Sequence, residues 1–313
     1  PGHVLDLRLA ADLGRIHAAL PAAGSGMVLP VRVAVHARQR DHDRGRRPEI
    51  FHAARETRTH HRRHAPLRAP SKLSRRDDGL RQLRIDGLAL AAGAVAGVRN
   101  VRNPIELATE VMRNSNHVFL SGKGANDFAI KQGVKLEPDE YFFSQFRYDQ
   151  WKAIRDSDNY SLDHTNHQLE ELMRDKKFGT VGAVACDRNG NLAGATSTGG
   201  MTNKKYGRIG DSPMIGAGTY ANNKTCAISC TGHGEIFIRS VAAYDVSCLI
   251  EYKSMSLQEA MDVVVNDKLV GMQGEGGMIG VDAQGNAAMI FNSAGMYRGA
   301  KHSMGLNAVF ISK

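Results

Sequence analysis

This sequence of 313 residues has few aromatic residues, only four cysteines and no long apolar run. No stretch approaches the roughly 18 apolar residues of a membrane-spanning helix, so a membrane protein is not predicted. Cys226 and Cys230 form a lone pair with no second pair, which favours neither a zinc site nor a disulfide framework. The N-terminal residues lack the apolar stretch and cleavage site of a secretory signal, so we expect a reducing, cytoplasmic location.

The first 86 residues contain no tyrosine, tryptophan, cysteine or asparagine, and Phe51 is their one phenylalanine. They hold 17 Arg and one Lys against nine acidic residues, so they carry the whole net charge of +9. The following residues carry 23 basic and 23 acidic side chains. With so few large apolar side chains, the basic segment cannot easily bury a core of its own.

Three interpretations of this basic segment, residues 1–84, stay open. The first is a disordered extension. The second is a nucleic-acid arm, since clustered arginines neutralise phosphates, but aromatic interleaving and a recognition motif are missing, so nucleic acid is not the expected partner. The third is the product of a shifted GC-rich reading frame, because such a frame yields this preference for Arg over Lys together with Ala, His and Pro.

Composition and pattern divide the chain into three segments: 1–84, 85–179 and 180–313. The second ends in a polar stretch, 156–179, whose lack of apolar periodicity predicts a long mobile linker. Loops of this length are uncommon inside compact domains and are often functional or processed. The third segment shows runs of strands followed by pairs of helices, which predicts an α+β layered domain.

Local patterns predict individual elements. Residues 88–98 are small and apolar, and their alanine content favours a helix, although a buried strand fits as well. Residues 138–155 and 235–252 predict two long helices. Residues 256–269 predict another helix, which begins with a capping box of Ser256 and Glu259. An Asn-Gly dipeptide at 189–190 predicts a tight hairpin turn.

The junction between the linker and the next strand places Thr180 directly after Gly179. A threonine hydroxyl is a poor nucleophile without an adjacent base, and the α-amine of an N-terminal threonine, with a pKa of about 8, can be that base. This chemistry requires cleavage of the Gly179–Thr180 bond, and a glycine before the bond tolerates the strained backbone of self-cleavage. Taken alone, a threonine that begins a strand reflects β-propensity.

Two glycine-containing loops carry further polar residues. Arg208 and Asp211 can hold an amino-acid head group, since arginine binds a carboxylate and aspartate an ammonium. The alternative is a local ion pair on the surface. In residues 230–235, CTGHGE, a strand meets the start of a helix, where backbone N–H groups can point at an oxyanion. An ordinary turn is the alternative there.

Several spaced motifs together carry a family resemblance. Residues 178–223, 229–235 and 276–299 closely resemble the plant-type L-asparaginase and isoaspartyl peptidase family of N-terminal-nucleophile hydrolases; they read FGTVGAVACDRNGNLAGATSTGGMTNKKYGRIGDSPMIGAGTYANN, SCTGHGE and GGMIGVDAQGNAAMIFNSAGMYRG. Residues 85–112 resemble the large-subunit segment of the family. The resemblance covers about residues 85 to 300. The related glycosylasparaginases are disfavoured, because the surroundings of Thr180 look plant-type.

The resemblance implies the catalytic roles. Thr180 would be the nucleophile, freed when the precursor cuts itself after Gly179. Thr198 would hydrogen-bond the hydroxyl of Thr180 and help to position it. Thr231 and Gly232 would form the oxyanion hole. The reaction would be hydrolysis of a side-chain or isoaspartyl amide, with L-aspartate as the product.

The resemblance also implies the substrate site, the fold and the assembly. Arg208 and Asp211 would bind the α-carboxylate and the α-amino group of L-asparagine or an isoaspartyl dipeptide, and Gly234 would add a backbone contact. The fold would be a four-layer αββα sandwich, assembled as a dimer of cleaved heterodimers. No catalytic metal or organic cofactor is implied, although family members often bind a structural sodium ion.

The resemblance stops where the composition breaks. The family begins with a strand that runs into a His-Gly-Gly-Ala-Gly segment, and it later has an Asn-Ala-Gly-x-Gly stretch near the sodium loop; residues 1–84 contain neither motif. We therefore expect a sandwich that is incomplete at its N-terminal side, with a sodium loop that is not recognisable. The alternative function is an inactive, unprocessed remnant of the family.

Overall fold

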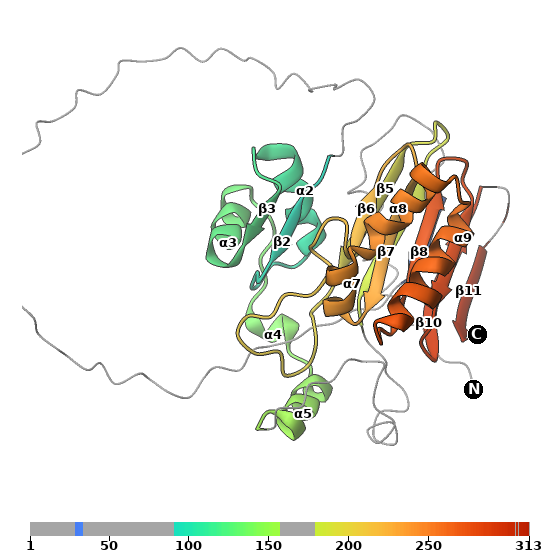
Figure 1. Cartoon of the computed structure of the whole chain (residues 1–313). Helices are drawn as coiled ribbons and strands as arrows, with labels where there is room; N and C mark the ends of the chain where they lie inside the picture. The colour runs from blue at the N-terminus through green and yellow to red at the C-terminus, as the bar shows by residue number, and fades with distance from the viewer. Residues whose placement is uncertain (1–28, 34–90, 157–178, 304, 306, 313) are drawn as a thin grey trace, which may run out of the picture. The chain divides into compact units, whose positions relative to one another are not determined.

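The computed structural model describes residues 29–33, 91–156 and 179–312, except 304 and 306 (Figure 1). Helices and β-sheets are both present in these ranges, so the α+β class is confirmed. Most of the basic segment and nearly all of the predicted linker lie outside the described residues. The division of the chain into three segments therefore stays a prediction.

The first sheet has five antiparallel strands in the order β11-β10-β1-β4-β5. The strands are β1 (Leu29–Val33), β4 (Val181–Cys186), β5 (Leu192–Ser197), β10 (Gly295–Lys301) and β11 (Asn307–Ser312). The hairpin predicted between β4 and β5 is confirmed. Its turn is fixed by Asp187, whose Oδ1 accepts hydrogen bonds of 2.8 Å from the backbone N–H groups of Asn189 and Asn191.

Strand β1 belongs to the basic segment. It pairs with two neighbours, since Val31 lies opposite Val184 of β4 and opposite Ala300 of β10. These five residues therefore take part in the sheet. The interpretations of the remainder of residues 1–84 stay predictions.

The second sheet has four antiparallel strands in the order β6-β7-β8-β9, and helices cover one of its faces (Figure 1). The strands are β6 (Thr219–Ala221), β7 (Cys226–Gly232), β8 (Gly276–Asp282) and β9 (Ala287–Phe291), and the helices are α7 (Gly234–Ser240), α8 (Ala242–Lys253), α9 (Leu257–Asp262) and the π-helical η1 (Val263–Leu269). Ile228 and Met278 of the sheet pack with Val246 and Met261 of the helices in one fully buried cluster. Each such side chain contributes about 1.5–3 kcal/mol of hydrophobic stabilisation.

A smaller buried cluster joins the two sheets. Val184 and Met296 come from the five-stranded sheet, and Ala227 and Ile279 come from the four-stranded sheet. Strand β4 contacts both β7 and β8. The two sheets therefore pack face to face, and the residues along β4 can be placed over those along β7.

The described residues before the linker form small elements: β2 (Ala94–Ala96), α2 (Pro104–Asn114), β3 (Phe119–Ser121), α3 (Gly122–Lys131), α4 (Asp139–Phe142) and α5 (Gln145–Ile154). The helix favoured for residues 88–98 is wrong over its described part. Ala94–Ala96 instead pair in parallel with β3, and Gly93 lies so close to α2 that a Cβ there would be 2.0 Å from the carbonyl oxygen of Ala108.

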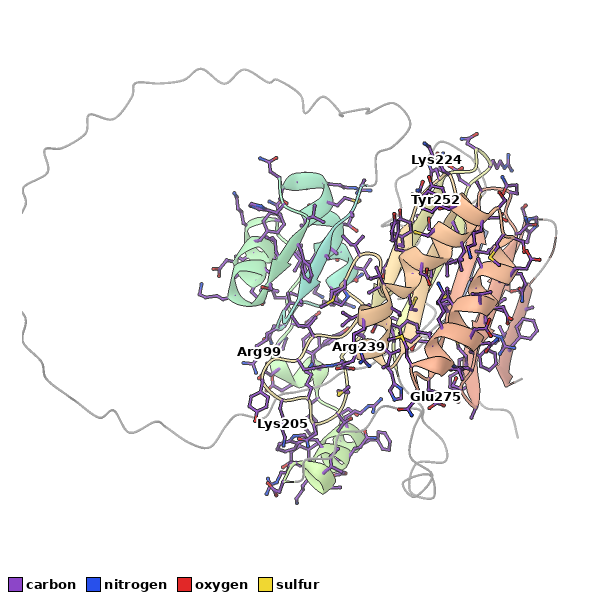
Figure 2. All side chains as sticks on the ribbon, viewed as in Figure 1. Arg99, Lys205, Lys224, Arg239, Tyr252 and Glu275 are labelled. Carbon is purple, nitrogen blue, oxygen red and sulfur yellow. The ribbon has the colours of Figure 1, made fainter. Side chains whose placement is uncertain are left out.

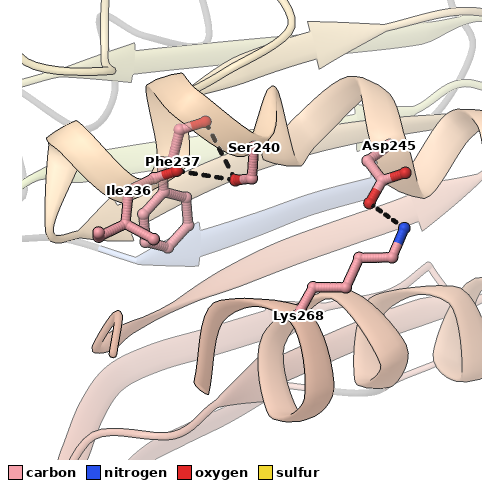
Figure 3. A network of polar contacts seen from close by, with 5 residues as sticks. All are labelled: Ile236, Phe237, Ser240, Asp245 and Lys268. Carbon is pink, nitrogen blue, oxygen red and sulfur yellow. Dashed lines mark hydrogen bonds and ion pairs between the residues drawn. The ribbon is translucent and has the colours of Figure 1, made fainter. Parts of the chain in front are cut away.

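The two long helices predicted from the sequence are each interrupted. Phe143 has extended backbone (φ −68°, ψ 134°) and separates α4 from α5. Val241 is left-handed (φ 49°) and separates α7 from α8. At the end of α7, Ser240 Oγ donates to the carbonyl oxygens of Ile236, at 2.8 Å, and Phe237, at 3.4 Å (Figure 3).

The remaining helix prediction holds at its N-terminus. The capping box of Ser256 and Glu259 is present, with hydrogen bonds in both directions between side chain and backbone. The helix continues from α9 into the π-helical turn η1. Lys268 in η1 forms an ion pair of 2.6 Å with Asp245 of α8 (Figure 3), which links the two helices at the surface.

None of the helices in the described ranges combines the length and apolar character needed to span a bilayer. In the same ranges, no three His, Cys, Asp or Glu residues gather closely enough to hold a metal ion. The four cysteines are free thiols.

Candidate active site

The backbone register of one hairpin places the two threonines of the predicted catalytic pair. Val181 lies opposite Ser197 in the β4–β5 ladder. Continued one step beyond the strands, the same register puts Thr180 opposite Thr198. Both threonines are partly buried. The recorded hydrogen bond of Thr198 Oγ1 comes from the backbone N–H of Gly200, at 3.0 Å, so a bond between the two threonine hydroxyls stays a prediction.

Close packing between the sheets brings this hairpin end to the end of β7. A Cβ on Gly182 would lie 2.0 Å from Ser229 Oγ, and a Cβ on Gly194 would lie 3.4 Å from the carbonyl oxygen of Ile228. Gly194 pairs with Val184 of β4, so Gly182 lies near Ser229 and Val184 lies near Ile228. Strands β4 and β7 therefore run in opposite directions. The start of β4, next to Thr180, therefore lies at the same end of the stacked sheets as the last residues of β7.

Three hydroxyl groups meet between the two sheets, close to the end at which β4 starts. Thr196 Oγ1 on β5 lies 2.6 Å from Ser229 Oγ on β7 and accepts a hydrogen bond from Thr219 Oγ1 on β6. Thr219 Oγ1 also lies 3.3 Å from the carbonyl oxygen of Ser212. This hydroxyl cluster of Thr196, Thr219 and Ser229 connects the nucleophile hairpin to the loop that carries Asp211. It was not foreseen from the sequence.

The last two residues of β7 are the predicted oxyanion donors. Thr231 lies opposite Gly277, and Gly232 lies opposite Gly276. Gly232 has φ +147°, and a Cβ there would lie 2.4 Å from the carbonyl oxygen of Glu275, so both backbone conformation and space require glycine. The neighbouring turn is held by Glu275, labelled in Figure 2, whose carbonyl oxygen accepts a 2.9 Å hydrogen bond from the N–H of His233.

The predicted head-group residues converge on Gly234, the first residue of α7. A Cβ at Gly234 would lie 2.8 Å from Arg208 Nη2, 2.9 Å from Asp211 Oδ1 and 3.1 Å from the backbone nitrogen of Asp211. The other face of the Arg208 side chain lies on Gly210, where a Cβ would be 2.7 Å from Nη1. The absence of a side chain at Gly210 thus leaves room for the guanidinium group, and its absence at Gly234 leaves room for both the guanidinium group and the carboxylate.

Asp211 carries a buried carboxylate that can accept a further hydrogen bond. The residue is 4% exposed, and Oδ2 is buried without a hydrogen-bond partner, as is the Oγ of the neighbouring Ser212. Burial raises the pKa of Asp211 to about 6, and the carboxylate of Glu235 adds to this rise, while Arg208 and backbone N–H groups oppose it. A ligand ammonium would supply the partner that Oδ2 lacks.

Arg208 pairs with a residue that the sequence did not single out. Its Nε and Nη2 donate to the two carboxylate oxygens of Glu235, at 2.7 and 2.8 Å. The predicted alternative, a surface ion pair between Arg208 and Asp211, is wrong, because Asp211 is buried and the recorded ion pair of Arg208 is with Glu235.

The predicted site residues therefore gather at one end of the stacked sheets. The register and packing place the threonines at 180, 198 and 231 at this end, and the loop of Arg208 and Asp211 contacts Gly234, two residues after Gly232. Gly179 precedes β4, as the predicted cleavage position requires.

Comparison with known proteins bears directly on this site. The family model described as Asparaginase matches residues 77–311. An isoaspartyl peptidase of Salmonella typhimurium is 53% identical over 214 residues, which are 68% of this chain and 67% of the relative. The corresponding Escherichia coli protein is 52% identical, over 68% of this chain and 66% of its own length. An isoaspartyl peptidase/L-asparaginase of Danio rerio is 39% identical over 68% of this chain and 65% of the relative.

The family match covers both the nucleophile hairpin and the head-group loop. The matches to the three relatives span about two thirds of the relatives' own length. The segment before residue 77 is unmatched by the family model, in agreement with the break in composition. The predicted family and its amidohydrolase class are confirmed, and the inactive-remnant alternative is not favoured. The chain belongs to the asparaginase family.

Proposed function

We propose that this chain is a self-processing amidohydrolase that acts on isoaspartyl dipeptides and L-asparagine and releases L-aspartate. One observation carries the choice of substrate. Arg208 Nη2 and Asp211 Oδ1 both lie within 3 Å of a Cβ built on Gly234, and Asp211 Oδ2 is buried without a hydrogen-bond partner, so a cation and an anion near one glycine can bind the two charges of an amino-acid head group. The start of the nucleophile hairpin lies at the same end of the stacked sheets as the last residues of β7, which lead into Gly234.

In the proposed mechanism, cleavage of the Gly179–Thr180 bond frees the α-amine of Thr180. The amine accepts the proton of the threonine hydroxyl as its oxygen attacks the amide carbonyl of the substrate. The hydroxyl of Thr231 and the backbone N–H of Gly232 stabilise the tetrahedral oxyanion, while Thr198 orients the nucleophile.

The amine of Thr180 then returns the proton to the leaving group, which departs as ammonia or as an amino acid. Water hydrolyses the threonine ester and releases L-aspartate, which regenerates the hydroxyl and the amine. These steps draw on the chain's own groups, without a catalytic metal or an organic cofactor. A structural sodium ion remains an expectation that rests on the resemblance alone.

We extend the proposal to the architecture. The two stacked sheets and the helices over the second sheet supply three layers of the αββα sandwich, and the fourth layer would complete it on the face of the five-stranded sheet. The assembly would be a dimer of cleaved heterodimers. A cytoplasmic location remains part of the same expectation.

The test is release of L-aspartate by the purified full-length chain from L-asparagine and from an isoaspartyl dipeptide. The wild type is expected to release aspartate, and Thr180→Ala is expected to lose at least about 1,000-fold in rate, because the nucleophile is gone. Thr109→Ala is a matched control, since Thr109 in α2 only donates to the carbonyl oxygen of Ile105 within the same helix. Equal activity of Thr180→Ala and wild type would exclude this nucleophile.

A further inference from the structure

The ion pair between Arg208 and Glu235 has a specific orientation. The two recorded bonds use Nε and Nη2, which form the lateral edge of the guanidinium group. The terminal edge, with Nη1 and the second hydrogen of Nη2, keeps its own pair of donors. An arginine can therefore bind one carboxylate laterally and a second carboxylate at its end.

The contacts of Arg208 connect this orientation with the predicted ligand site. Nη2, which is shared by both edges, lies 2.8 Å from a Cβ built on Gly234, and Asp211 Oδ1 lies 2.9 Å from the same point. The Arg208 side chain is 17% exposed, whereas Glu235 is 53% exposed and stands at the outer side of the pair. Glu235 thus holds the guanidinium group from its more exposed side, through bonds that do not use Nη1 of the terminal edge.

We propose that Glu235 is a positioning residue, which fixes the guanidinium group of Arg208 so that its terminal edge receives the α-carboxylate of the substrate. The inference rests on the proposed function, because it assigns the partner of a residue in that site. Glu235 itself would not touch the substrate. It acts by removing the rotational freedom of a long side chain before the ligand arrives.

The charges around the site agree with this role. The hydrogen bonds from Arg208 lower the pKa of Glu235, so the pair stays ionised near neutral pH. The groups that face Asp211 are Arg208 and Glu235, and the thiol of Cys230 lies near it as well. Glu235 raises the pKa of Asp211, and its replacement by a neutral residue should therefore lower that pKa.

The experiment compares wild type, Glu235→Gln and the matched control Glu251→Gln, whose exposed glutamate lies in α8 away from the site. Binding of L-aspartate to the purified full-length protein is measured by calorimetry, which needs no turnover. Hydrolysis is measured with L-asparagine and with its α-carboxamide analogue, which lacks the α-carboxylate.

For Glu235→Gln we expect the Kd of L-aspartate and the KM of L-asparagine to rise about tenfold, with kcat changed less than about threefold. Hydrolysis of the α-carboxamide analogue should be unchanged relative to wild type. The acidic limit of activity should move to lower pH. Glu251→Gln should match wild type in every respect.

Arg208→Lys is a second variant that tests the positioning role of Glu235, because lysine cannot form the bidentate ion pair. Adding Glu235→Gln to Arg208→Lys should cause little further loss, since the two residues act through one interaction. Unchanged aspartate binding by Glu235→Gln would overturn the inference, and so would an equal loss with both substrates. A wild-type protein that is cut but neither binds aspartate nor hydrolyses either substrate would instead overturn the proposed function itself, and the inference with it.

Discussion

The two halves of the candidate site are held by different forces. The head-group half, made of Arg208, Asp211, Gly234 and Glu235, depends on charges: a bidentate ion pair and a buried carboxylate. The nucleophile half, made of Thr180 and Thr198, depends on strand register and on the close packing of two sheets.

Because of this difference, we expect that substrate binding and reactivity can be changed independently. The head-group half has its charges in place in the intact chain. The nucleophile half gains its base only when one peptide bond is cut. Changes to the first half should therefore alter affinity, while changes to the second should alter processing and rate. The predictions below challenge that division, from the largest expected effect to the smallest.

The largest effect is expected for Gly234→Ala in the head-group half. The new Cβ would lie 2.8 Å from Arg208 Nη2 and 2.9 Å from Asp211 Oδ1, so it would force both charged groups to move. We expect aspartate affinity to fall about 100-fold by calorimetry, which corresponds to roughly 2.7 kcal/mol. Gly271→Ala is the control, because its Cβ would meet nothing within 4 Å. Wild-type affinity in Gly234→Ala would contradict the placement of the head-group half.

Gly182→Ala should affect the other half. Its Cβ would lie 2.0 Å from Ser229 Oγ, so the sheets must separate or the hydroxyl cluster must rearrange. Overpacking of this kind costs about 2 kcal/mol, which urea unfolding of the full-length protein can measure. Self-cleavage should slow, as followed by gel electrophoresis over time, while protein that is cut should bind aspartate with nearly normal affinity.

Gly124→Ala serves as the control for this variant, because a Cβ there meets nothing within 4 Å. A Gly182→Ala protein with normal processing and a large loss of aspartate affinity would contradict the claim that the nucleophile half determines processing and the head-group half determines affinity.

The smallest effect is a pH dependence of binding. An ammonium ligand requires the ionised form of Asp211, whose pKa is raised to about 6 by burial. Aspartate affinity should thus be constant above this pH and fall about tenfold for each pH unit below it. The unliganded protein behaves in the opposite sense, since a folded state that holds its proton longer than the unfolded state loses stability as pH rises toward 6. Calorimetry from pH 4.5 to 8 checks the first trend, and Asp211→Asn should remove it.

Local signals in the sequence predicted several elements correctly. The capping box at Ser256 and the hairpin at 189–190 are both present, because each depends on residues a few positions apart. The break at Val241 could not be predicted, since a β-branched residue disfavours φ of 49°. Long-range bonds stabilise it: the N–H groups of Ala243 and Tyr244 donate to the carbonyl oxygens of Ala217 and Gly216.

In the candidate site, too, only relations between residues close together in the sequence could be predicted. Arg208 and Asp211 could be selected as a pair because they lie three residues apart. The actual partner of Arg208 could not, since Glu235 lies 27 residues away and an acidic residue in the first turn of a helix is common for electrostatic reasons. The hydroxyl cluster of Thr196, Thr219 and Ser229 likewise joins strands of two sheets, and nothing in the local pattern of any one strand predicts it.

The most direct test of the central claim is the intact mass of the purified protein under denaturing conditions. The account predicts two chains, residues 1–179 and 180–313, with Thr180 at the new N-terminus of the second. Thr180→Ala should give one uncut chain of 313 residues. A single uncut chain in the wild type would mean that Thr180 has no free amine, and it would contradict the proposed nucleophile and favour the inactive remnant.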